Sequence, residues 1–256
     1  MVTRRGFLAG AGVLAGGSAL SACSPGVQAE ASISTASLAT ETVVFDGVHQ
    51  AGIATPQQAS LNLVAFTVRP GVDRDGIIRL MRLWTEDARA LCHGQTPLGS
   101  LEPEMAVSPS NLTITCGFGS RLFDIAGIVD QRPEWLHPIP AFDRDQLDDR
   151  WGEADLVLQV CSDDPMTLSH ATRHMIRAGV DYVSTRWFQS GFLNANGARE
   201  KDATPRNLFG QKDGTVNPRT EEEIQEAAWI DEGPVWARQG TAMVVRRIAM
   251  NLDTWE

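Results

Sequence analysis

The sequence is short of cysteine, of positive charge and of long apolar runs. Its 256 residues include 4 cysteines and no Cys-x-x-Cys pair, which excludes a disulfide scaffold and a zinc-finger framework. Lysine and arginine number 22 against 32 aspartates and glutamates, and the formal charge of −10 repels nucleic acid and anionic lipid. The N-terminal apolar run is glycine-rich and shorter than the roughly 20 residues that a membrane-spanning helix needs. We therefore expect a globular protein with no nucleic-acid partner.

The N-terminus has the pattern of an export signal. Residues 1–23 read MVTRRGFLAGAGVLAGGSALSAC, in which Arg4 and Arg5 precede a short Gly/Ala-rich run. This order resembles a twin-arginine signal, and its alternative is a tail in which the arginines pair by chance. The last four residues resemble a bacterial lipobox that would make Cys23 a lipid anchor; the alternative is ordinary signal-peptidase cleavage. We expect the mature protein in the periplasm or on the outer face of the cytoplasmic membrane.

The body of the chain predicts an α+β, ferredoxin-like domain over residues 59–205. Residues 24–58 form a polar tether and an entry segment ahead of it. Alternation and helical spacing give the order β-α-β-β-α-β, which is typical of an antiparallel sheet with both helices on one face. The expected strands are 61–68, 111–119, 154–162 and 180–188, and the expected helices are 73–91 and 164–178. The segment 120–150 is expected to be an insertion between the two middle strands.

Residues 206–256 predict a second unit of the same kind that is incomplete. A helix is expected from Thr220 to Ala228, since Thr220 begins a glutamate-rich stretch. The stretch 240–256 is expected to form one more strand and the first residues of a helix. With no partner strand to follow, the strand at 242–252 would be exposed and prone to aggregation.

The stretch 207–218, NLFGQKDGTVNP, places Asp213 in a glycine-flanked loop. Gly210 and Gly214 lack a Cβ, so the backbone can turn sharply and approach a flat ligand closely. The alternative is an ordinary Lys-Asp-Gly turn with no chemical role. Spacing alone does not decide between them.

Several segments together resemble the dye-decolorizing peroxidases, which are haem enzymes. The resemblance runs from about residue 41 to residue 256 and is strongest to the exported deferrochelatase/peroxidase branch of that family. It implies two ferredoxin-like domains. The matching segments, in chain order, are GVHQAGIATPQQ (47–58), ADLVLQVCSDDP (154–165), RWFQSGF (186–192), TPRNLFGQKDGTVNP (204–218) and VVRRIAMNLDTW (244–255).

The resemblance implies a haem b peroxidase that reduces hydrogen peroxide and oxidises dyes, phenols or porphyrins. It places the distal acid–base residue at Asp213 and the main chain lying on the haem at Gly214, Thr215 and Val216. A carboxylate can accept and return the proton that peroxide cleavage requires. Because carboxylic acids ionise well below neutral pH, activity is expected to persist into mild acid.

The family's proximal histidine and distal arginine are expected beyond Glu256, so we interpret the chain as an amino-terminal fragment. A full-length form is expected to be a homo-oligomer. Two alternatives stay open: a lipid-tethered haem- or iron-handling component with iron-uptake partners, or an inactive fragment.

None of the five histidines lies where the family's iron ligand would be. His170 and His174 are four residues apart on one face of a predicted helix, as a metal pair would be, but surface histidines are the expectation. His49 is expected to organise the entry segment. His93 and His137 have no assigned role.

Two further pairs bear on the interpretation. Cys116 and Cys161 fall on the middle strands and are expected to be buried free thiols. Arg246 and Arg247 are adjacent in a predicted strand, so at most one of them could reach a haem propionate.

Overall fold

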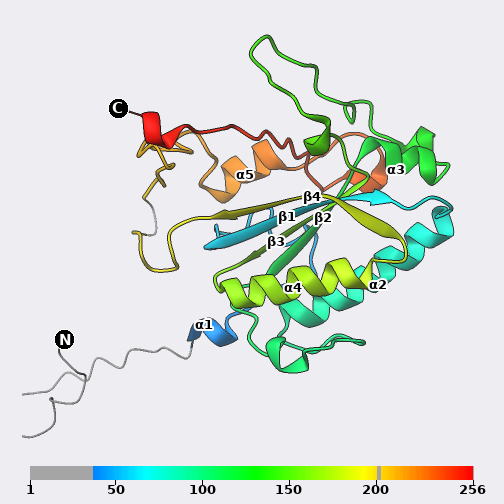
Figure 1. Cartoon of the computed structure of the whole chain (residues 1–256), viewed down its shortest axis with the longest axis horizontal. Helices are drawn as coiled ribbons and strands as arrows, with labels where there is room; N and C mark the ends of the chain where they lie inside the picture. The colour runs from blue at the N-terminus through cyan, green and yellow to red at the C-terminus, as the bar shows by residue number, and fades with distance from the viewer. Residues whose placement is uncertain (1–36, 201–202, 256) are drawn as a thin grey trace, which may run out of the picture. The chain divides into compact units, whose positions relative to one another are not determined.

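The computed structural model describes residues 37–200 and 203–255, and the chain divides into units of residues 1–34 and 35–256 (Figure 1). The predicted export signal, with Arg4, Arg5 and Cys23, lies outside the described residues. Within the described ranges, no helix has both the length and the apolar character needed to cross a bilayer.

Four antiparallel strands form the sheet, in the order β2-β3-β1-β4. The strands are β1 (Ser60–Val68), β2 (Thr113–Phe118), β3 (Leu156–Ser162) and β4 (Val183–Phe192). Every neighbouring pair is antiparallel, and a bulge at Ala65/Phe66 interrupts the pairing of β1 with β4. This order confirms the predicted ferredoxin-like arrangement, with β3 at a central position.

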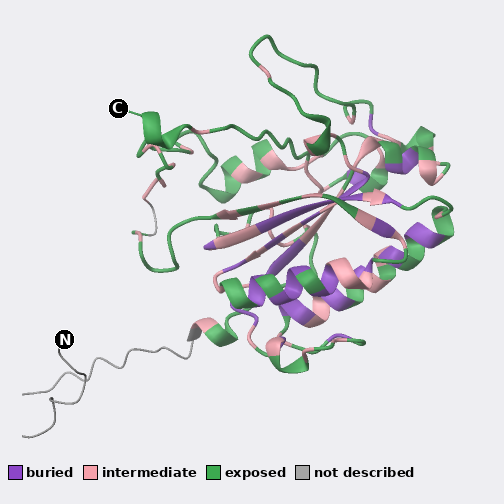
Figure 2. Ribbon diagram, viewed as in Figure 1, coloured by how far each residue is buried: buried purple, intermediate pink, exposed green. Residues whose placement is uncertain are grey.

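Helices α2 (Arg74–Cys92) and α4 (Pro165–Ala178) lie side by side on one face of the sheet (Figure 1). Each helix is capped by an aspartate: Asp73 accepts from the Gly76 amide and Asp164 from the Thr167 amide. Their inward faces pack on Val64, Phe66 and Leu158, which are almost completely buried. Figure 2 shows this buried layer between the sheet and the two helices. Trp84 links the helices, because its Nε1 donates to the Met175 carbonyl at 3.0 Å.

The opposite face of the sheet is covered by the entry segment, residues 47–58. Ala51 accepts a 2.6 Å hydrogen bond from Thr115 Oγ1, and Gly52 accepts one of 2.9 Å from Gln159 Nε2. Gly52 has a φ of 94°, and a Cβ there would lie 2.3 Å from Thr115 Oγ1. Only glycine fits this approach of the segment to the sheet.

The other elements are short. Thr220 caps α5 (Glu221–Ala228) through a capping box with Glu223, as its sequence predicts. The remaining elements are α1 (Ser37–Thr40), α3 (Ser120–Ile125) and five single 3₁₀ turns, at Pro103–Met105, Val129–Gln131, Asp149–Trp151, Val235–Ala237 and Leu252–Thr254.

The prediction of a strand within residues 240–256 is wrong. Residues 241–250 carry no regular secondary structure, and a 3₁₀ turn stands where the helix was expected. A strand is stabilised by hydrogen bonds to a neighbour, and within the described residues no strand pairs with this segment. It lies instead on the side of the sheet away from α2 and α4 (Figure 1).

The thiols of Cys116 and Cys161 are free and half-buried, which corrects the expectation of full burial. They lie on neighbouring strands, as predicted, but they are not opposite each other. The cross-strand partner of Cys116 is Leu158, and that of Cys161 is Thr113. Cys116 packs against the core between the sheet and the helices. Because side chains alternate between the two faces along a strand, Cys161 lies on the other face of the sheet. Burial raises the pKa of Cys116 to about 12 and that of Cys161 to about 11.

Candidate functional site

The loop that carries Asp213 is closed by main-chain hydrogen bonds. Arg206 and Lys212 form an antiparallel bridge, and the Asn207 amide donates to the Gln211 carbonyl at 2.9 Å. Arg206 Nη1 donates to the Gly210 carbonyl at 2.5 Å, which braces the turn from the side. The sequence around Asp213 therefore forms a turn of defined shape, and Asp213 follows directly after its closing bridge.

The Asp213 side chain is exposed, while its backbone is fixed. Its amide donates to the Pro205 carbonyl at 2.9 Å. Within residues 37–200 and 203–255, no hydrogen bond or ion pair joins its carboxylate to another residue. The next residue, Gly214, has a φ of 88°, and a Cβ there would meet Asn217 Nδ2 at 2.7 Å. This arrangement leaves the carboxylate free to act on a bound molecule.

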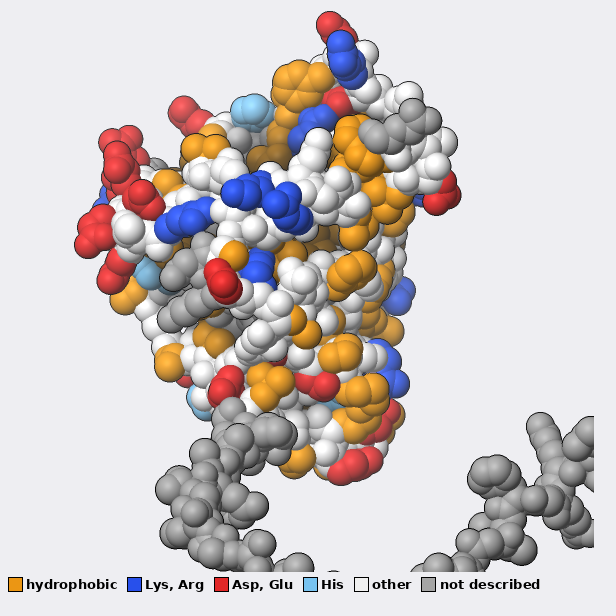
Figure 3. All heavy atoms as spheres, turned by 90° about the vertical axis from the view of Figure 1, so that its left-hand side faces the viewer, with side chains coloured by type: hydrophobic (Ala, Val, Ile, Leu, Met, Phe, Trp, Pro, Cys, Tyr) orange, Lys and Arg blue, Asp and Glu red, His pale blue; other side chains and the backbone are white. Residues whose placement is uncertain are grey.

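Apolar side chains stand exposed around the same loop. Val216 is 94% exposed and Leu208 is 62% exposed. Phe209 is partly buried, because its ring packs on Trp255 with the centroids 4.6 Å apart. Figure 3 shows the side of the molecule seen from the left of Figure 1, where hydrophobic, acidic and basic side chains gather in separate groups. An apolar surface with one free carboxylate is suited to a flat, largely apolar ligand.

His49 joins the entry segment to the C-terminal part of the chain. Its ring stacks on Trp229 with centroids 3.6 Å apart, and its Nδ1 lies 2.8 Å from the Gln239 carbonyl. Gln239 and Gly240 are hydrogen-bonded to Ile230 through the main chain. The contacts of His49, which was predicted to organise the entry segment, extend to the segment around Gln239. Nothing in the sequence indicated that Trp229 would contribute.

Arg246 and Arg247 are directed to different partners, although they do not lie in a strand. Arg246 pairs with Asp145. Arg247 Nε donates to Gln189 Oε1 at 2.9 Å, and its guanidinium lies 3.4 Å from the centroid of the Trp151 ring. Both side chains are thus engaged with the insertion or with β4, and sequence spacing alone gave no indication of these partners.

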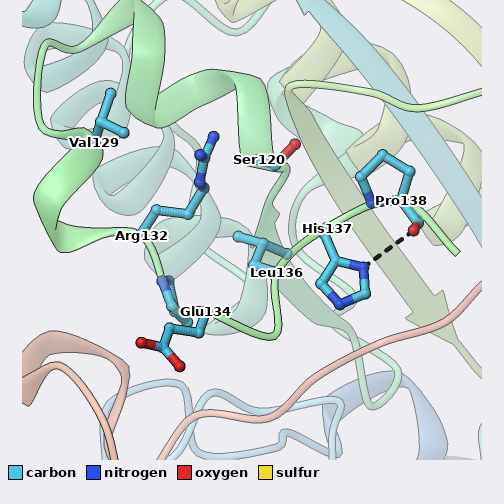
Figure 4. A pocket seen from close by; sticks show the side chains of 8 residues that line it. Ser120, Val129, Arg132, Glu134, Leu136, His137 and Pro138 are labelled. Carbon is cyan, nitrogen blue, oxygen red and sulfur yellow. Dashed lines mark hydrogen bonds between the residues drawn. The ribbon is translucent and has the colours of Figure 1, made fainter.

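The insertion 120–150 contains a cavity of about 330 Å³. Figure 4 shows the Arg132 and His137 side chains on either side of Leu136. Arg132 Nη1 donates to Asp124 Oδ2 at 3.2 Å, and His137 Nδ1 lies 3.1 Å from the Pro138 carbonyl. Arg132 and His137 are thus each tied to a neighbouring group of the insertion.

The predicted surface positions of His170 and His174 are wrong. His170 is 1% exposed and His174 is 3% exposed, and both lie in the layer of α2 and α4. They share one face of α4 with Ala171 and Met175, which are buried in the core. Among the described residues, no group of three or more His, Cys, Asp or Glu side chains could hold a metal ion.

Comparison with known families matches nearly the whole described body of the chain. Residues 50–193 match the Dyp-type peroxidase N-terminal domain, and residues 204–256 match the Dyp-type peroxidase C-terminal domain. The chain belongs to the Dyp-type peroxidase family. The resemblance noted from its sequence motifs is thereby confirmed.

Curated relatives of this Dyp-type chain include a deferrochelatase from Shigella flexneri. It is 35% identical over 99% of this chain and 64% of its own length. The chain thus spans less than two thirds of the curated relative.

Similar solved structures include the DyP-type peroxidase from Cellulomonas bogoriensis, with a TM-score of 0.82 and 44% identity over 86% of this chain and 61% of that one. Ferric DtpA from Streptomyces lividans has a TM-score of 0.75 and 38% identity, and the match covers 80% of this chain and 56% of that one.

Dyp-type peroxidases bind haem, and the described residues fit one side of such a group. The exposed loop from Asp213 to Val216 combines a free carboxylate, a tight glycine and an apolar tip. The histidines are engaged elsewhere: His49 with Trp229, His174 with Asp87, and His137 within the insertion. His93 Nδ1 lies 2.7 Å from the Arg89 carbonyl at the end of α2, and His170 is buried. These contacts of the described histidines assign none of them to a haem iron.

Proposed function

We propose that this chain is the distal part of a haem b peroxidase that reduces hydrogen peroxide and oxidises dyes, phenols or porphyrins. The observation that carries the proposal is the Asp213 carboxylate, which is exposed and unpaired within the described residues while its amide is held by Pro205. Membership of the family supplies the reaction class. Bound haem b supplies the redox chemistry of its iron.

Asp213 moves the proton in this proposal. Its carboxylate accepts the proton of one peroxide oxygen and returns it to the other, which leaves as water. A positioned carboxylate can do both, because it is a base when ionised and an acid once it has taken the proton. Overall, the donor supplies two electrons and two further protons are taken up, so that the second peroxide oxygen is also released as water.

The main chain of Gly214, Thr215 and Val216 would hold the cofactor in this proposal. Gly214 allows a close approach, because its left-handed backbone and the nearby Asn217 side chain leave no room for a Cβ. Val216, almost fully exposed in the described residues, would bury its side chain on binding. Burial of such a side chain contributes about 1.5–3 kcal/mol.

Asp213→Asn in the haem-loaded protein tests this role. We expect the rate of peroxide-driven dye oxidation to fall by about 10²–10⁴-fold, the usual share of general acid–base catalysis. Asp231→Asn is the matched control, because Asp231 is also exposed and follows the loop in the chain. The haem absorption spectrum should be retained in both variants. Unchanged peroxide reactivity of Asp213→Asn would refute the role of the carboxylate.

A second candidate function is haem or iron handling in an uptake system, with iron-uptake proteins as partners. The name of the curated relatives, deferrochelatase, favours it. Turnover of a reducing dye at a rate set by Asp213 supports the peroxidase. Transfer of haem or iron to a partner protein without dye turnover supports handling instead.

We also propose export by the twin-arginine route to the periplasm or the outer face of the cytoplasmic membrane, with Cys23 as a lipid anchor. The motif at Arg4 and Arg5 and the residues before Cys23 support it. Replacing both arginines by lysine should retain the protein in the cytoplasm, and Cys23→Ser should release an exported protein from the membrane fraction. A homo-oligomer of the full-length form is part of the same proposal, and light scattering tests it.

A further inference from the structure

The layer formed by α2 and α4 holds a buried cluster of ionisable side chains that takes no part in the Asp213 loop. His170 and His174 lie one turn apart on α4, with ring centroids separated by 6.4 Å. Asp87 approaches them from α2, and Glu102 approaches from the residues before the 3₁₀ turn Pro103–Met105. Arg173 and Arg177 of α4 complete the charged surroundings.

His174 ties the two helices together. Its Nε2 lies 2.8 Å from Asp87 Oδ2, and the two side chains are 3% and 5% exposed. An ionised carboxylate only accepts hydrogen bonds, so Nε2 carries a proton and donates. The other ring nitrogen, Nδ1, is buried and has no hydrogen-bond partner within the described residues.

His170 has no such partner. Its Nε2 is buried without a hydrogen bond in the described part of the chain, and its nearest acid is Glu102 Oε2 at 4.0 Å. That distance is too long for a hydrogen bond. The same carboxylate oxygen lies 3.6 Å from Arg177 Nη2, so Glu102 is shared between two basic groups.

The surroundings disfavour a charge on His170. Burial lowers its pKa below the ordinary value of 6.5, and His174, Arg173 and Arg177 act in the same direction while Glu102 opposes them. A charge on His170 would lie in a space from which water is excluded. His170 is therefore held neutral at neutral pH.

We propose that His170 makes the packing of the helical layer pH-dependent. Its protonation in acid loosens the packing of α4 against α2 and against the segment around Glu102. The sign follows from linkage. A histidine whose pKa is depressed by folding stabilises the folded layer at pH above 6.5. That contribution is lost as the pH falls from 6.5 toward and through the depressed pKa. The device would make the layer respond to an acid surrounding without involving the peroxide site.

Amide hydrogen exchange tests this role of His170, with the rates corrected for the intrinsic effect of pH on amide exchange. Between about pH 7.5 and about pH 5.5, protection of α4 should fall further than protection of β3, because the folded layer disfavours the protonated form of His170. His170→Asn removes the titrating group and should abolish this difference. His137→Asn makes the same change at an exposed histidine and should leave it intact.

Glu102→Gln sharpens the test. Glu102 is the acid that favours the charged form of His170, so its loss should deepen the fall in α4 protection at low pH. Should His170→Asn fail to fold, the His170 ring can be titrated by NMR in the unmodified protein. A midpoint at or above 6.5 would overturn the proposal, as would an equal fall in protection of α4 and β3.

Discussion

The sheet region, residues 59–193, and the C-terminal region, residues 203–255, differ in how they are held together. The sheet region has one continuous core in which Phe66, Leu80 and Leu158 are 1% exposed or less. In the C-terminal region, among its described residues, only Ala237 is buried. Its backbone is fixed instead by turns, by the capping box of α5 and by contacts such as His49–Trp229.

This difference explains why the candidate site lies where it does. A core residue has its side chain surrounded by other residues, so it cannot approach a ligand. Asp213 is in the opposite situation, because its amide is bonded to Pro205 while its carboxylate and the neighbouring Val216 remain exposed. The proposed site is therefore on a loop and not in the core, as binding and catalytic residues often are.

The largest expected contrast is between a core residue and a loop residue. Phe66 is 1% exposed and packs on Trp84 with ring centroids 5.2 Å apart. Phe66→Ala should lower the free energy of unfolding by about 3–5 kcal/mol, because it leaves a cavity in a close-packed core. Val216→Ala should change it by less than about 0.5 kcal/mol. Urea unfolding followed by circular dichroism measures both, and equal losses would contradict the division into two regions.

Sequence predicted the sheet region well because each of its elements has a local signal. Asp73 and Asp164 cap helices whose apolar residues recur at helical spacing, and the strands alternate between core and surface. The same signals misled at residues 241–250. Val244, Val245 and Ile248 favour a strand by type, but strand formation also requires a neighbouring backbone, which no residue type encodes.

Burial of the α4 histidines was missed, although the sequence held a signal for it. Leu168, Ala171 and Met175 mark the buried stripe of the helix, and His174 lies three residues after Ala171 on that stripe. The buried imidazole of His174 is paired there with Asp87 of α2. That partner comes from a helix 87 residues away, so the sequence alone could not identify it.

The position of Asp213 in a glycine-flanked turn was predictable, since glycine at 210 and 214 favours the left-handed backbone that both residues adopt. The contacts that hold the loop in place were not predictable. Contacts such as Phe209–Trp255 join residues far apart in the chain, and they depend on the tertiary arrangement. The catalytic role of Asp213 stays a prediction.

A smaller effect is expected where the entry segment meets the sheet. Gly52 and Gly71 both have positive φ, but a Cβ at Gly52 would meet Thr115 Oγ1 at 2.3 Å, whereas nothing lies within 4 Å of one at Gly71. Gly71→Ala should cost about 1–2 kcal/mol, from backbone strain alone. Gly52→Ala should cost about 1–3 kcal/mol more, as overpacking does. Thermal unfolding of the two variants separates crowding from strain; equal losses would mean that the segment moves freely off the sheet.

The smallest effect on global stability, and the most local one, is expected at the junction of the two regions. His49→Ala removes the stacked ring on Trp229 and the bond to the Gln239 carbonyl, but it leaves the core of the sheet region untouched. The free energy of unfolding should therefore fall by no more than about 2 kcal/mol, since one such ring pair and one hydrogen bond each contribute about 1 kcal/mol. Protease cleavage within residues 229–248 should become faster while β1 and β3 stay protected, because the turn around Gln239 loses its link to the entry segment. His93→Ala, at an exposed histidine near the end of α2, is the control that should leave this cleavage unchanged. If His49→Ala instead lowered the protection of the whole sheet, the C-terminal region would be part of the same cooperative unit, and the distinction between the two regions would not hold.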